Sequence, residues 1–154
     1  MSDEVICRYV GAFILFWKRK RAIKRVLVVE DEPLMAFDNE QRLERLGYEV
    51  VGTRDNYEDA RRDIEAEEVD LVIADIDLAG EKSGIDVAEL AKTKGVPVLF
   101  ATGKPPTDCA VYALGSLEKP YTDKQLKDAV AAIDAILAGE EPGEVKGLTL
   151  YDIG

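Results

Sequence analysis

The sequence contains no histidine and only two cysteines among its 154 residues. The lack of histidine excludes His-based catalytic triads, histidine metal ligands and a phosphorelay histidine within this sequence. Cys7 and Cys109 provide neither a disulfide framework nor the spacing of a zinc site. We therefore expect a protein of the reducing cytoplasm whose chemistry depends on other side chains.

Basic residues are scarce outside the first 25 positions. Residues 1–25 carry seven Lys or Arg against two acids, whereas the rest of the chain carries 13 against 29. Such an acidic body repels the phosphates of nucleic acids, so we expect no nucleic-acid partner. The hydrophobic fraction of 47% argues against global disorder, and a chain of this length is most simply one domain with a substantial core.

The chain also lacks an apolar run long enough to span a membrane. The longest run, residues 9–17, has about half of the roughly 20 residues that a spanning helix needs. Basic residues follow this run, whereas a signal peptide carries them before it. We assign 1–25 to an N-terminal extension. It either contacts a membrane surface through residues 9–25 or adds nothing to the fold, and we favour the second interpretation.

Between residues 26 and 138, apolar strands alternate with amphipathic helices. Strands are expected at 26–30, 49–53, 70–75, 96–101 and 115–118, and helices at 33–46, 57–67, 84–94 and 122–138, with a short further helix at 108–113. This alternation predicts an α/β fold with a doubly wound five-stranded parallel sheet of order 2-1-3-4-5. We expect residues 139–154 to form a C-terminal tail.

Acidic residues follow two of the buried strands. Glu30 and Asp31 follow the first strand, and Asp75 ends the third. In the predicted order these strands are neighbours, and their carboxyl ends flank the point where such sheets bind ligands. Carboxylates that close together need a cation or a raised pKa, and an all-oxygen cluster favours Mg²⁺. We predict a Mg²⁺ site formed by these three carboxylates and the backbone carbonyl of Asp77.

A carboxylate beside Mg²⁺ can also act as a nucleophile. Asp75 in this position could attack phosphorus and form an aspartyl phosphate. The added negative charge would need a cation and a hydroxyl or amide donor nearby. Thr102 follows the fourth predicted strand and Lys119 follows the fifth, so both are placed for these roles.

The same residues lie in four short motifs that resemble those of response-regulator receiver domains. The motifs are Val28-Val29-Glu30-Asp31-Glu32-Pro33, Ala74-Asp75-Ile76-Asp77-Leu78, Ala101-Thr102-Gly103 and Leu117-Glu118-Lys119-Pro120. The resemblance covers about 26–138 and implies a CheY-like fold. It implies that Asp75 is the phosphoacceptor and that Glu30 and Asp31 are the acidic metal-binding pair. Thr102 would contact the phosphate, and Lys119 would pair with it.

A narrower resemblance concerns Phe100-Ala101-Thr102-Gly103, which is similar to the "FAT GUY" receivers of alphaproteobacteria. The stretch 75–86 resembles receivers of the general stress response in that lineage, which implies a histidine kinase of the HWE or a related family as partner. Two departures stand out. Few residues separate Thr102 from Lys119, so the helix between them must be short or irregular. Ser116 replaces the usual switch aromatic, which leads us to expect phosphorylation to act by ordering residues 103–113.

The leading expectation is a single-domain response regulator that is not an enzyme. It would take a phosphoryl group from a histidine kinase and act on a downstream regulator or phosphotransfer protein, or serve as a phosphate sink. One alternative is a non-phosphorylated receiver-like scaffold, against which Asp75, Thr102 and Lys119 argue. Another is a small Mg²⁺-dependent acid phosphatase. Asp75-Ile76-Asp77 is similar to the nucleophile motif of haloacid-dehalogenase-like phosphatases, but that motif lies on a first strand.

Overall fold

A computed structural model describes residues 23–66, 68–103 and 112–151. The strands are β1 (Arg25–Val29), β2 (Glu49–Arg54), β3 (Leu71–Ala74), β4 (Val98–Thr102), β5 (Gly115–Glu118) and β6 (Leu148–Leu150), and the helices are α2 (Pro33–Arg45), α3 (Tyr57–Ala66), α4 (Gly84–Thr93) and α5 (Asp123–Leu137). Three predictions fall wholly or mostly outside the described residues: the structure of 1–22, the short helix at 108–113 with Cys109, and the ordering of 103–113.

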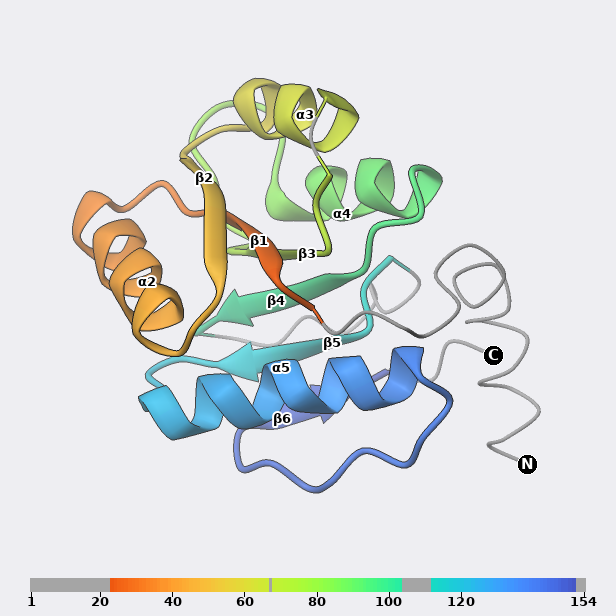
Figure 1. Cartoon of the computed structure of the whole chain (residues 1–154). Coiled ribbons are helices and arrows are strands. Elements are labelled where there is room, and N and C mark those ends of the chain that lie inside the picture. Colours follow the sequence, from red (N-terminus) through yellow and green to blue (C-terminus); the bar gives the residue numbers. More distant parts are fainter. Residues whose placement is uncertain (1–22, 67, 104–111, 152–154) are drawn as a thin grey trace.

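The strands form one sheet of order β2-β1-β3-β4-β5-β6. The first five strands are parallel in the predicted order 2-1-3-4-5, which confirms the doubly wound α/β fold. The sixth strand was not predicted. Residues 148–150, which we had assigned to the tail, pair antiparallel with the outer edge of β5 (Figure 1).

Helices cover both faces of the sheet. The helices α2 and α5 lie on one face, and α3 and α4 lie on the other (Figure 1). Alternate residues of β1 therefore enter different cores: Val26 and Val28 pack in the cluster with α5, whereas Leu27 and Val29 pack in the cluster with α3 and α4. Burial on both faces explains why the central strands are continuous apolar runs.

Residues 23–25, at the start of β1, make hydrogen bonds to the rest of the fold. We had assigned 1–25 to the extension, but Ile23 is only 4% exposed and Arg25 begins β1. The Ile23 N–H donates to the Asp134 carboxylate, and the N–H groups of Lys24 and Arg25 donate to Asp70. The folded part thus includes Ile23. Within the part of the chain that the structure describes, no helix is both long and apolar enough to cross a membrane.

Side-chain caps fix the starts of two helices. The Thr122 hydroxyl accepts from the Gln125 N–H at 3.0 Å, and the Gln125 side chain accepts from the Thr122 N–H at 2.9 Å, which together form a capping box. Asn56 caps α3 by accepting from the Asp59 N–H at 2.9 Å. The start of α5 fixes the path of the chain directly after β5, where Lys119 lies.

Candidate functional site

The predicted acidic residues meet at the carboxyl ends of β1 and β3. Carboxylate oxygens of Glu30, Asp31 and Asp75 lie within 4.8 Å of one another. Backbone hydrogen bonds set their positions, because the Asp75 N–H donates to the Val29 carbonyl at 2.9 Å and the Glu30 N–H donates to the Arg54 carbonyl at 2.8 Å. The neighbouring strands therefore deliver the three carboxylates to one place, as the sequence indicated.

Lys119 reaches this acidic cluster from the end of β5. Its Nζ lies 2.8 Å from a carboxylate oxygen of Glu30 and 3.1 Å from Oδ2 of Asp75. The Lys119 N–H donates to the carbonyl of Thr102 at 2.9 Å, and Thr102, at the end of β4, is 3% exposed. Four strand ends thus bring the five predicted side chains to one edge of the sheet.

The second carboxylate oxygen of Asp75 also has a donor. The Asp77 N–H donates to Oδ1 of Asp75 at 3.2 Å, while Oδ2 faces Lys119. This bond orients the Asp75 carboxylate, because one donor contacts each oxygen. For Asp77 the described contact is through its N–H, and the carbonyl ligand that we predicted stays a prediction.

Burial and charge act in opposite directions on the central ion pair. Burial raises the pKa of Glu30 above its ordinary value, although the hydrogen bond from Lys119 offsets part of this effect. Burial alone would lower the pKa of Lys119, but its hydrogen bonds to Glu30 and Asp75 outweigh this and raise the pKa. The amine is therefore held in its cationic form next to two carboxylates, and it offsets part of their repulsion.

A hollow of about 270 Å³ opens beside the acidic cluster. Its polar lining comes from the end of β1, from β2 with the residue after it, and from α3: Glu30, Asp31, Thr53, Arg54, Asp55 and Asp59. Oxygen atoms dominate these side chains, and hard cations such as Mg²⁺ prefer oxygen ligands. The donor set fits Mg²⁺, which would place a cation among carboxylates that one lysine neutralises only in part.

Comparison with known protein families identifies the family of the chain. The family model of the response regulator receiver domain matches residues 26–131, which include all five predicted side chains. The chain belongs to the response regulator receiver domain family. Receiver domains of this family are parts of two-component signalling systems, which agrees with the expectation drawn from the four motifs.

Relatives of this receiver domain include known bacterial regulators. It is 44% identical to the phyllosphere-induced regulator PhyR of Methylorubrum extorquens over 82 residues, which are 52% of this chain and 31% of PhyR. It is 32% identical to the transcriptional regulatory protein PdtaR of Mycobacterium tuberculosis over 117 residues, which are 72% of this chain and 55% of PdtaR. The chain thus matches about a third to a half of these relatives. The PhyR similarity is consistent with the narrower "FAT GUY" resemblance.

A solved structure supports the fold and bears on the site. The response regulator protein TrrA of Thermotoga maritima, determined in complex with Mg²⁺ and BeF, is 31% identical with a TM-score of 0.65. The match covers 71% of this chain and 97% of TrrA. A relative of this receiver domain thus binds Mg²⁺.

Two hydrogen bonds that fix the segments after Lys119 and after Asp75 were not predicted. Tyr121, two residues after Lys119, donates from its hydroxyl to the Asn39 side chain of α2 at 2.7 Å, and both residues are buried. Burial raises the pKa of Tyr121 to about 12, so its hydroxyl remains a donor at neutral pH. The Gly84 N–H donates to the carbonyl of Ile76 at 2.7 Å, which fixes the chain just after Asp75. The sequence offered two signals for these contacts. One is the aromatic residue directly after Lys119-Pro120, and the other is the glycine at the start of a helix.

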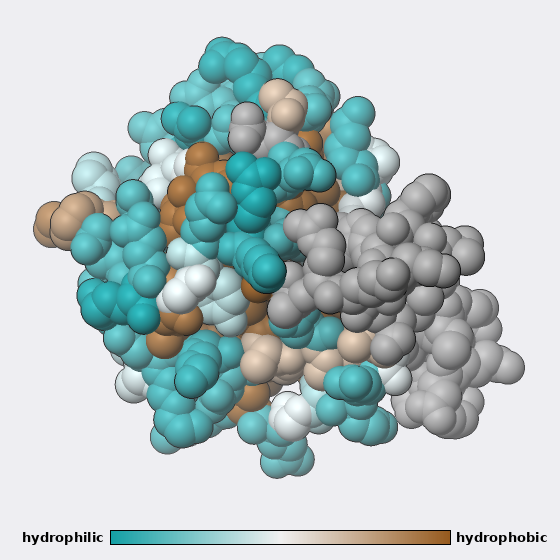
Figure 2. Space-filling model, in the orientation of Figure 1, coloured by the Kyte–Doolittle hydropathy of each residue, from teal (hydrophilic) through white to brown (hydrophobic). Residues whose placement is uncertain are grey.

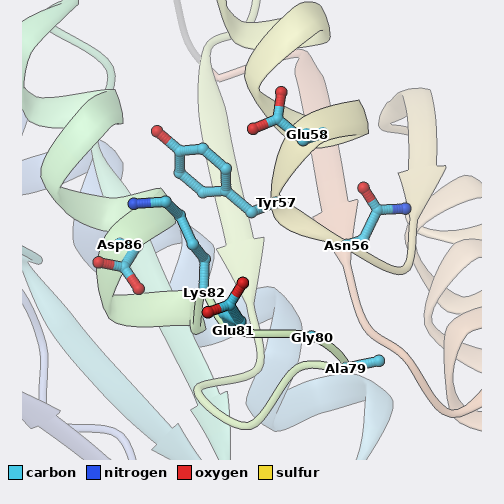
Figure 3. A pocket seen from close by; sticks show the side chains of 8 residues that line it. All are labelled: Asn56, Tyr57, Glu58, Ala79, Gly80, Glu81, Lys82 and Asp86. Atoms are coloured by element: carbon cyan, nitrogen blue, oxygen red, sulfur yellow. The ribbon is translucent and has the colours of Figure 1, made fainter.

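A second hollow lies beside the receiver site and differs in chemistry. It has a volume of about 500 Å³ and lies between the start of α3 and the loop from β3 to α4 (Figure 3). The Lys82 amine lies 5.2 Å from the centre of the Tyr57 ring, and the two side chains point toward each other (Figure 3). Asp86 is engaged in capping α4 through the Ser83 N–H. These contacts hold the loop from β3 to α4 against the start of each neighbouring helix. The residues that line this hollow do not belong to the acidic cluster.

Proposed function

We propose that this receiver domain accepts a phosphoryl group on Asp75 from a histidine kinase. The observation that carries the proposal is the position of the Asp75 carboxylate. It lies 3.1 Å from the Lys119 amine and belongs to a cluster with Glu30 and Asp31 whose oxygens are within 4.8 Å. A nucleophilic carboxylate with a fixed cation on one side and a metal-binding pair on the other is arranged for phosphoryl transfer.

The transfer step exchanges one bond for another. An oxygen of Asp75 attacks the phosphorus atom of the phosphohistidine, forming a P–O bond as the P–N bond breaks. The electron pair of the broken bond remains on the imidazole nitrogen, and a proton already on the other ring nitrogen of the phosphohistidine makes the leaving group neutral histidine. Lys119 then pairs with a phosphoryl oxygen, and the Thr102 hydroxyl donates to another. Charge stabilisation of this kind carries most of the catalysis in phosphoryl transfer.

In this proposal Mg²⁺ would be held by the carboxylates of Glu30, Asp31 and Asp75, with the carbonyl of Asp77 as a further ligand. When bound, the ion neutralises charge on the transferring phosphoryl group. The fit rests on the all-oxygen donor set and on the surplus of carboxylates over the single amine. Mg²⁺ retains several waters in such sites, so the protein needs to supply only a few ligands.

We further propose where the phosphoryl transfer takes place and which proteins take part. The donor is a histidine kinase, of the HWE or a related family by resemblance, acting in the cytoplasm where ATP is available. The phosphorylated domain then contacts a downstream regulator or phosphotransfer protein, or drains phosphate from a shared kinase.

Phosphorylation of an Asp75→Asn variant tests the proposal. We expect the wild-type chain to gain acid-labile phosphate from a histidine kinase or from acetyl phosphate in the presence of Mg²⁺, and the variant to gain none. Asp128→Asn, which changes a partly exposed acid on α5 that pairs with Lys124, is the matched control and should be labelled like the wild type. Equal labelling of Asp75→Asn contradicts the assignment. Lack of labelling in every chain favours the scaffold, and turnover of a generic phosphoester favours the phosphatase.

A further inference from the structure

The outer edge of β5 is fully occupied by residues 146–151, which we call the β6 segment. The paired residues are Gly115 with Leu150, Ser116 with Thr149, and Leu117 with Leu148. The contacts continue beyond the ladder at both ends, because the Tyr151 N–H donates to the Leu114 carbonyl and the Glu118 N–H donates to the Gly147 carbonyl, each at 2.9 Å. Backbone contacts with the β6 segment therefore extend to the residue directly before Lys119.

The β6 segment also contacts the start of α5. The Gln125 side-chain amide donates to the Lys146 carbonyl at 2.8 Å, while the same side chain accepts from the Thr122 N–H. Leu148 and Leu150 pack against the core that α5 shares with β5. The β6 segment thus contacts the chain on both sides of Lys119, at Glu118 before it and at Gln125 after it.

Gly115 in β5 allows the β6 segment to approach closely. A Cβ atom on Gly115 would lie 2.5 Å from the carbonyl oxygen of Thr149 and 3.2 Å from a methyl carbon of Leu150. Glycine inside a strand often marks a close approach of another backbone, and here that backbone is the chain's own C-terminal segment. The match to the receiver family ends at residue 131, so the β6 segment lies outside the matched residues.

We propose that the β6 segment positions Lys119 by binding the β5 edge, so that phosphoryl transfer to Asp75 depends on it. The proposal rests on the proposed function. Without the β6 segment, β5 would be a four-residue edge strand with no partner on its outer side. The Lys119 amine needs a defined position to contact Glu30 and Asp75 together, and displacement of a catalytic group by about 1 Å can cost up to about 100-fold in rate. Lys119 is the catalytic residue, and the β6 segment acts through it.

The test uses the full chain with Thr149→Pro. Proline has no N–H and disfavours strand pairing, while Thr149 is exposed, so the core composition is unchanged. Thr149→Val is the matched control, because valine favours strands. The readouts are the rate of Asp75 phosphorylation by acetyl phosphate with Mg²⁺, and the NMR signal of the Lys119 side-chain nitrogen without any phosphodonor. Lys119→Arg assigns that signal by removing it.

We expect Thr149→Pro to slow phosphorylation by about tenfold or more and to shift the Lys119 signal, whereas Thr149→Val changes neither. A synthetic peptide of residues 140–154, added to the Thr149→Pro chain, should restore both readouts, and the same peptide with Thr149→Pro should not. Lower stability alone would reduce the melting temperature but leave the Lys119 signal of the folded protein unshifted.

If Thr149→Pro does not fold, Gln125→Glu provides a second test. Gln125→Glu keeps the capping acceptor for Thr122 but removes the donor to Lys146, so it should shift the Lys119 signal and slow phosphorylation to a smaller extent. A rate and a Lys119 signal at the wild-type values in the folded variants overturn the proposal. If the wild-type chain takes no phosphoryl group on Asp75, the proposed function fails, while the Lys119 signal still decides whether the β6 segment positions this side chain.

Discussion

Gly84 lies directly against the backbone of Asp75. A Cβ atom on Gly84 would be 1.9 Å from the Asp75 carbonyl oxygen and 2.8 Å from its carbonyl carbon. Both atoms belong to the backbone and cannot rotate away, so any side chain at position 84 must displace the segment that carries the phosphoacceptor. The start of α4 and the position of Asp75 are therefore coupled through one close contact.

Replacing Gly84 with alanine should disturb both stability and phosphorylation. Overpacking of a close contact costs typically about 1–3 kcal/mol, and we expect Gly84→Ala to lower the free energy of unfolding by at least that amount. Urea denaturation measures this loss, and labelling with acetyl phosphate should fall in the folded variant. Gly143→Ala is the control, because a Cβ there meets nothing within 4 Å. Equal effects of the two substitutions would contradict the proposed coupling.

Magnesium should stabilise the domain through the acidic cluster. A ligand that binds only the folded state at 100 times its Kd adds about 2.7 kcal/mol, so the melting temperature should rise as Mg²⁺ is titrated. Asp31→Ala removes one carboxylate of the cluster and should abolish this rise, whereas Asp128→Ala should retain it. A wild-type response to Mg²⁺ in Asp31→Ala would show that the metal binds elsewhere.

The sequence predicted which strand-end side chains lie together better than it predicted the edges of the fold. Glu30, Asp75 and Lys119 could be placed because each follows an apolar strand, and parallel strand ends meet at one edge of the sheet. β6 was missed because three residues are too few to show strand periodicity. The available signal was Gly115, since glycine within a strand indicates close backbone approach.

The contacts at the start of β1 also could not be predicted from the sequence. Ile23 is an apolar residue beside a basic run, and its N–H donates to Asp134, which is 111 residues away along the chain. No local pattern indicates such a contact. The polar partners of buried groups, such as Asn39 for Tyr121, also escaped prediction because they become neighbours only when α2 packs beside the start of α5.

Asp134 should make stability depend on pH. Burial raises its pKa above the ordinary value of 3.8, and the nearby charges of Asp70 and Glu140 raise it further, against the opposing bond from the Ile23 N–H. A pKa raised by folding contributes stability that is complete below the unfolded pKa and is lost as pH rises through the folded pKa. Asp134→Asn retains an oxygen acceptor for Ile23 without this ionisation.

The free energy of unfolding of Asp134→Asn, relative to the wild type, should therefore increase as pH rises from about 4 and then become constant above the folded pKa. Urea denaturation of both chains between pH 4 and 7.5 gives this difference. A difference that falls with rising pH would mean that the Asp134 charge stabilises the fold.

Two exposed apolar side chains lie close to the acidic cluster. Leu34 and Phe37, at the start of α2, are 82% and 63% exposed, and α2 begins two residues after Asp31. Figure 2 shows apolar side chains projecting over this end of α2 from a hydrophilic surface. Exposed apolar residues beside a reactive group indicate a docking surface, and we expect the kinase helix that carries the phosphohistidine to contact it.

The double variant Leu34→Ser, Phe37→Ser should separate docking from chemistry. Loss of apolar contact residues from an interface typically costs 1–2 kcal/mol or more, so phosphotransfer from the kinase should slow by about tenfold. Labelling by acetyl phosphate should remain at the wild-type rate, because Asp75, Lys119 and the acidic pair are unchanged. The melting temperature should hardly change, since both side chains are already in water. A loss with both donors would instead show that these residues support the site itself, and no loss with the kinase would place its docking surface elsewhere.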